Sequence, residues 1–96
     1  MRRVITPNVG PATPIEVVVV RSPACHLCEE ALDALDQMRR RFSLDVRVVE
    51  IDSPEGRTIV ARHRPAIPPA VLIDGRLFSS GRLPKKKLQR ALERVA

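Results

Sequence analysis

The chain has 96 residues, of which 44% are hydrophobic and 29% charged, and it carries a net charge of +6. A chain of this size and composition forms one globular domain with a modest core, which excludes two domains and intrinsic disorder. Phe42 and Phe78 are its only aromatic residues; base stacking is therefore nearly excluded, and we interpret the basic charge as a solvated surface without a specific nucleic-acid partner.

The apolar run at Val17–Val20 is the longest in the N-terminal third of the chain. A secretory signal needs about 7–15 apolar residues and a membrane-spanning helix about 20. We therefore expect a cytoplasmic protein without a membrane partner. In a reducing cytosol, two cysteines favour redox catalysis or metal binding over a structural disulfide.

In chain order, residues 1–14 are rich in proline and glycine and are predicted to form an extended leader, followed by a domain at 15–96. The β-branched run Ile15–Val20 predicts a strand that is buried on both faces. From Cys25 to about Arg41, apolar residues recur at steps of three and four, which predicts an amphipathic helix.

Alternation, capping residues and turn signals predict the remaining elements. These are a strand at Leu44–Ile51 and a short helix with Ser53 at its cap and Pro54 at its first position, which ends near Arg64. A hairpin of Ala70–Ile73 and Arg76–Ser79 around Asp74-Gly75 follows, and Pro84 opens a last helix. The order β-α-β-α-β-β-α predicts an α/β fold in which a four-stranded mixed sheet carries helices on both faces.

Cys25 and Cys28 form a C-x-x-C between the first strand and the first helix. One helical turn separates them, so they share a face and can close a small disulfide. Free backbone N–H groups at a helix start can stabilise a thiolate at Cys25, and His26 would assist either as a cation or as a neutral hydrogen-bond donor. This motif beside a βαβ pattern is typical of thioredoxin-like redox proteins.

Two segments carry a family resemblance. Pro23–Ala31, P-A-C-H-L-C-E-E-A, resembles the P-x-C-H-L-C-E-x-A stretch of small glutaredoxin-like proteins. Ile67–Gly75 resembles the segment in which an apolar residue, a cis-proline, a short strand and an Asp-Gly turn follow one another. With the order of elements from Ile15 to Val95, the sequence resembles the thioredoxin superfamily, most closely its glutaredoxin-like branch.

The resemblance implies a thiol–disulfide oxidoreductase with Cys25 as the nucleophile and Cys28 as the resolving cysteine. Counting back from Asp74 puts the family's cis-proline on Pro69 rather than Pro68. Pro68 would then precede it without an N–H to offer an extended substrate. The residues assigned to substrate binding are Arg21, Pro23, His26, Ile67, Pro68 and Pro69.

The implied partners are protein disulfides or glutathione, with no cofactor except glutathione as a possible reductant, and the protein is expected to be a monomer. Glutaredoxins often place a basic residue three positions before the nucleophile, where this chain has Ser22, with Arg21 one step away. The buried acid of thioredoxins is replaced by Val19. The resemblance therefore carries the redox fold but not residue-by-residue recognition of glutathione.

Two other functions remain open. The first is an interaction module that keeps the fold without turnover, and the second is a metal or Fe–S protein. A closed zinc site needs four ligands, and the soft candidates are Cys25, Cys28, His26 and His63. Because His26 points off the cysteine face and His63 lies in the second predicted helix, we expect no metal site within one chain.

Overall fold

The computed structural model describes residues 13–95, so positions 1–12 of the predicted leader lie outside the described residues. The predicted order of elements and the α/β fold class are confirmed. The strands are β2 (Ile15–Arg21), β3 (Leu44–Glu50), β4 (Ala70–Ile73) and β5 (Arg76–Ser80); the helices are α1 (His26–Met38), α2 (Pro54–His63) and α3 (Lys85–Val95). Among these helices, none is long and apolar enough to cross a membrane.

The first helix is shorter than the predicted span of Cys25 to Arg41. Cys25 has extended backbone angles (φ −102°, ψ 105°) and is the N-cap instead of the first helical residue. At the other end, the Met38 carbonyl accepts the N–H groups of Arg41 (3.0 Å) and Phe42 (2.9 Å). These bonds close a turn that ends the regular helix and leads the chain into β3.

The sheet has the strand order β3-β2-β4-β5. β2 pairs with β3 in parallel and with β4 antiparallel, and the β4–β5 hairpin completes the sheet. Because β2 lies between two strands, its four valines are buried on both faces, as the run of valines predicts. The register brings Arg21, Ala70 and Ser80 to the same end of the sheet.

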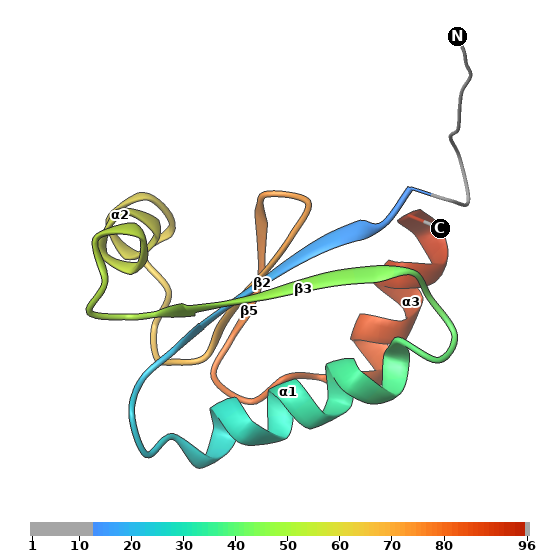
Figure 1. The fold of residues 1–96 in the computed structure, drawn as a ribbon, viewed down its shortest axis with the longest axis horizontal. Helices are drawn as coiled ribbons and strands as arrows, with labels where there is room; N and C mark the ends of the chain where they lie inside the picture. The colour runs from blue at the N-terminus through green and yellow to red at the C-terminus, as the bar shows by residue number, and fades with distance from the viewer. Residues whose placement is uncertain (1–12, 96) are drawn as a thin grey trace, which may run out of the picture.

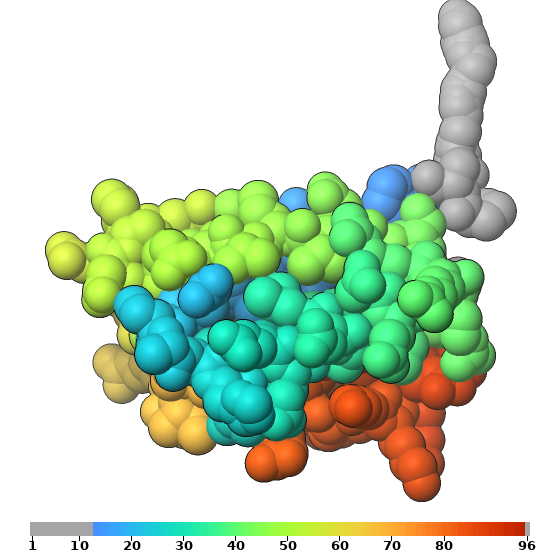
Figure 2. All heavy atoms as spheres, turned by 60° about the horizontal axis from the view of Figure 1, so that its bottom comes forward, coloured from blue at the N-terminus to red at the C-terminus, as the bar shows by residue number. Residues whose placement is uncertain are grey.

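Helices cover both faces of the sheet (Figure 1), as predicted. Leu35 of α1 and Leu88 and Leu92 of α3 pack with Val17 and Val19 in the larger cluster. The space-filling view shows α1 running across this face with α3 next to it (Figure 2). The smaller cluster on the opposite face contains Val18, Val20, Val49, Ala70 and Leu72, with Ile59 of α2 packed against it.

Two polar contacts fix α2 on the end of β3. The Ser53 hydroxyl accepts the Gly56 N–H (3.0 Å) and donates to the Glu50 carbonyl (2.7 Å), which confirms the predicted cap. The Glu55 carboxylate accepts a hydrogen bond from Arg47 Nη1 at 2.7 Å and raises the pKa of this guanidinium. Gly56 is buried where the helix meets the strand end.

The close approach of α2 to β3 predicts that Gly56→Ala destabilises the fold. A Cβ at this position would overlap the Glu50 carbonyl oxygen and lie 2.8 Å from that of Ile51. Such overpacking costs about 1–3 kcal/mol, which urea unfolding followed by circular dichroism would measure. Arg57→Ala, at the exposed next position, is the control and should change stability by less than about 0.5 kcal/mol. Equal stability of the two variants would contradict the close approach.

Candidate functional site

The C-x-x-C follows the carboxyl end of the central strand. The chain leaves β2 at Arg21 and turns through Ser22, Pro23 and Ala24 before α1 begins at His26. Ala24 has a left-handed backbone (φ 50°), which is uncommon for a residue other than glycine. This tight turn places Cys25 at the N-cap of α1. Pro23 and Ala24 in the turn are exposed to solvent.

The two cysteines have different environments although they form one disulfide. Their Cα atoms lie 5.2 Å apart, as one helical turn allows. Cys28 is only 1% exposed and belongs to the buried side of α1, whereas Cys25 is half-buried. The Cys25 sulfur accepts the Cys28 backbone N–H at 3.1 Å. An attacking reagent therefore meets Cys25 first, and Cys25 is the sulfur that a helix N–H group already contacts.

His26 interacts with α1 itself. Its side chain is 84% exposed, and Nε2 lies 3.3 Å from Oε2 of Glu30, one turn further along the helix. His63 lies in the last turn of α2. Among residues 13–95, no three His, Cys, Asp or Glu side chains come together in an arrangement that could hold a metal ion.

Residues 64–69 connect α2 to β4, and we call them the proline loop. This loop approaches the same end of the sheet. Ala70 pairs with Val20, so Pro69 lies beside the end of β2. Residues 22–24, which we call the cysteine turn, follow this end of β2. The Pro68–Pro69 peptide bond is cis, which confirms the choice of Pro69. Pro69 is buried, whereas the Ile67 side chain next to it is 54% exposed. The loop therefore offers an apolar side chain at the rim of the site.

Gly81 holds this loop in place. Its N–H donates to the carbonyls of Ile67 and Pro69, both at 3.0 Å. Gly81 has φ 82°, and a Cβ there would lie 3.1 Å from the Ile67 side chain, so the position favours glycine. Behind the loop is a cavity of about 200 Å³, whose apolar lining includes Val20, Val60 and Ile67.

The other predicted substrate residues divide into two groups. Pro23 is exposed in the cysteine turn, where a partner would meet it. Arg21 is only partly exposed, and its Nε lies 3.7 Å from Oε2 of Glu50 on the neighbouring strand. The two groups form an ion pair without a hydrogen bond, and Nε itself is buried, so this atom of Arg21 is not accessible to a substrate carboxylate.

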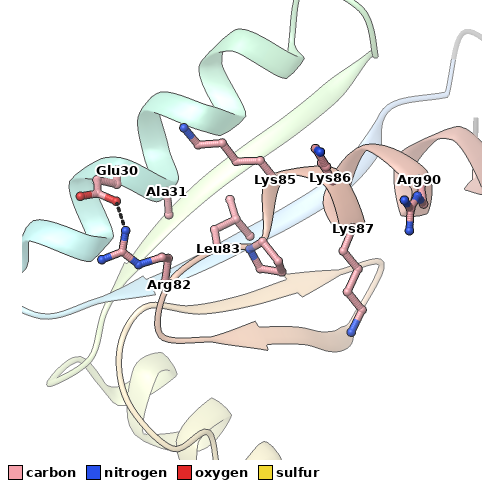
Figure 3. Close-up of a pocket in the computed structure, with 9 residues that line it drawn as sticks. Glu30, Ala31, Arg82, Leu83, Lys85, Lys86, Lys87 and Arg90 are labelled. Carbon is pink, nitrogen blue, oxygen red and sulfur yellow. Dashed lines mark ion pairs between the residues drawn. The ribbon is translucent and has the colours of Figure 1, made fainter.

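Sequence reasoning missed Glu30 and Arg82. Glu30 Oε1 lies 3.6 Å from Nη1 of Arg82 (Figure 3). The other carboxylate oxygen of Glu30 faces His26. The spacing of four between His26 and Glu30 signals the first contact. No local pattern signals the second, because it joins α1 to the segment between β5 and α3.

Comparisons with known proteins agree with this geometry. The sequence profile of the Glutaredoxin-like domain (DUF836) matches residues 16–93. No relative was found among the curated proteins.

Three solved structures illustrate the likeness of the fold. The thioredoxin-like protein BC3987 superposes with a TM-score of 0.64 at 19% identity, covering 79% of this chain and 99% of its own. A thioredoxin-like protein from Clostridium perfringens superposes with a TM-score of 0.69 at 13% identity, covering 86% of this chain and 71% of its own. Oxidized mitochondrial thioredoxin 3 from Saccharomyces cerevisiae superposes with a TM-score of 0.60 at 14% identity, covering 88% of this chain and 81% of its own. The chain therefore belongs to the glutaredoxin-like domain family, and its fold is thioredoxin-like.

Proposed function

We propose that the protein is a thiol–disulfide oxidoreductase that exchanges its Cys25–Cys28 pair with protein or glutathione disulfides. The observation that carries the proposal is the asymmetry of the pair at the start of α1. The Cys25 sulfur is partly exposed at the N-cap, and Cys28 is buried one turn into the helix. Dithiol exchange requires a nucleophilic thiol that is accessible to the partner and a resolving thiol that is shielded from solvent.

The exchange proceeds in two displacements. In the reduced protein, the Cys25 thiolate attacks one sulfur of the partner disulfide; a Cys25–partner bond forms, the partner's own bond breaks, and its second sulfur leaves as a thiolate. The Cys28 thiolate then attacks Cys25 Sγ, which closes the Cys25–Cys28 disulfide and releases the first partner sulfur. Two electrons and two protons pass to the partner, and a thiol reductant such as glutathione returns the protein to its dithiol form.

The start of α1 favours Cys25 as the attacking thiolate. In the disulfide form its sulfur accepts the Cys28 N–H at 3.1 Å, and in the dithiol form the same donor would stabilise a negative charge. The positive end of the helix dipole acts in the same direction. Cys thiols at helix starts have pKa values of about 3.5–7.5 instead of about 8.5, so a useful fraction of such thiols is ionised at neutral pH.

Recognition of the partner rests on few groups. Pro68 has no N–H, so only its carbonyl is available to pair with an extended substrate. The exposed Ile67 side chain in the proline loop and Pro23 just before the cysteines offer apolar surface for contact with a partner. These features support a protein disulfide as the main substrate, with glutathione as the reductant.

The asymmetry predicts unequal alkylation of the reduced protein. Below pH 7, Cys25 should react with iodoacetamide at least about tenfold faster than Cys28, because it is both more exposed and more ionised. Peptide mapping by mass spectrometry after timed quenching measures the two rates. Unfolding in guanidinium is the control and should make the rates nearly equal; equal, slow rates in the folded protein would count against a tuned nucleophile.

The two cysteines should also differ as variants. Cys25→Ser should lower the reduction of insulin disulfides by about 100-fold or more, because the attacking sulfur is gone. Cys28→Ser should still attack and should accumulate a mixed disulfide, which a gel without reductant reveals. A peptide–glutathione mixed disulfide, tested in parallel, shows whether glutathione is a substrate. Lack of turnover of both substrates by the wild type would instead support an interaction module that keeps the fold.

A further inference from the structure

A basic hollow lies beside the first turns of α1. It measures about 630 Å³, and Arg82, Lys85, Lys86, Lys87 and Arg90 line it; we call these five residues the basic groove. Figure 3 shows Lys85 extending toward α1 and Lys87 toward β5. A second hollow of about 650 Å³ follows along α3, shares Lys87 and Arg90 with the first, and adds Arg94 and the acidic Glu93. Glu93 lies 3.8 Å from Arg41, so cations outnumber acids along most of the helix.

The charge of the groove is almost uncompensated. Glu30 is the only acidic residue described in its lining, and it contacts Arg82 at 3.6 Å. Within residues 13–95, the other four cations form no salt bridge. Lys87 instead has its Nζ 5.9 Å from the centre of the Phe78 ring. Four neighbouring cations repel one another, so a ligand with several negative charges would lower the electrostatic energy of this surface.

The start of α3 departs from the electrostatic pattern of the other helices. α1 and α2 carry Glu29 and Glu55 in their first turns, as the helix dipole favours. α3 begins with three lysines and has no acidic residue in its first turn. Each cation there opposes the dipole, and such breaks of a local rule are expected where function requires them.

One end of the groove, at Arg82, adjoins the redox site. Glu30 joins Arg82 to His26, which directly follows Cys25. Arg82 also follows Gly81, whose N–H holds the proline loop through Ile67 and Pro69. Glu30 lies little more than one helical turn after Cys25, so a protein whose disulfide reacts with Cys25 can reach the Arg82 end of the groove.

We infer that the basic groove binds acidic side chains of the protein whose disulfide reacts with Cys25. This inference rests on the proposed function and names the chemistry of its partner: a disulfide flanked by aspartate or glutamate. The groove extends along α3 and presents more cations than the two carboxylates of glutathione can neutralise. A nucleic acid would find no aromatic platform, since Phe78 lies under Lys87.

Two cyclic peptides test the inference. Each is closed by one disulfide, and they differ only in that four aspartates flanking the disulfide in one are asparagines in the other. Stopped-flow measurement of their reduction by the dithiol form of the full chain gives two second-order rate constants. For the wild type we expect the acidic peptide to react about tenfold faster at low ionic strength, and this ratio to fall toward one as salt rises.

Two matched triple variants locate the effect. Lys85→Gln/Lys86→Gln/Lys87→Gln should bring the ratio close to one. It should fold, because its substitutions are exposed and remove charges that oppose the helix dipole. Arg57→Gln/Arg62→Gln/Arg64→Gln removes the same charge at exposed positions in and just after α2, on the opposite face of the sheet from α3, and should keep most of the ratio. An equal fall of the ratio in both variants would assign the effect to net charge and overturn the proposal.

Binding is measured separately from chemistry. A linear acidic peptide with serine in place of each cysteine should shift the amide resonances of residues 82–90 in the oxidised protein. If neither cyclic peptide is reduced, the proposed function fails, while these shifts still support the groove. If both cyclic peptides are reduced equally fast, the groove proposal is overturned and the redox function stands. Binding of an oligonucleotide of equal charge but not of the acidic peptide would also overturn it.

Discussion

The position of β2 in the middle of the sheet is the constraint on which the rest of the structure depends. Parallel pairing with β3 and antiparallel pairing with β4 bury its valines on both faces and fix the register of the neighbouring strands. The register brings three chain segments to one end of the sheet: the cysteine turn after Arg21, the proline loop before Ala70 and the segment after Ser80. These segments are loops, which vary without loss of the core, while the strands hold them in place.

Helix α1 gives its two cysteines different environments. The N-cap leaves Cys25 outside the helix with its sulfur at a backbone N–H, whereas the helical period turns Cys28 into the core. No charged side chain is needed for this distinction. In thioredoxins proper a buried acid accompanies the cysteines, but Val19 fills the corresponding position here and packs in the larger core cluster. The difference between the thiols therefore depends chiefly on the helix itself.

Local signals predicted nearly all of the fold. The β-branched run identified the central strand, Ser53 and Pro54 the start of α2, and Asp74-Gly75 the hairpin. The end of α1 was misplaced because Arg39 and Arg40 suit a helix, and only the carbonyl of Met38, bonded twice, shows the turn. The cysteines and Pro69 were found because their motifs are local. The contact of Glu30 with Arg82 was not, since it joins segments 52 residues apart through tertiary packing.

The same packing explains how the fold tolerates its basic groove. Three lysines at the start of α3 oppose the helix dipole at about 0.3–1 kcal/mol each, before their mutual repulsion. Leu88 and Leu92, on the other side of the helix, are fully buried against β2 and α1 and contribute about 1.5–3 kcal/mol each. The hydrophobic contribution therefore matches or exceeds the cost that the helix dipole imposes, and the helix stays docked with its lysines in solvent. Because this offset comes from the core, the exposed lysines of the groove can be exchanged for neutral residues without loss of the helix's packing.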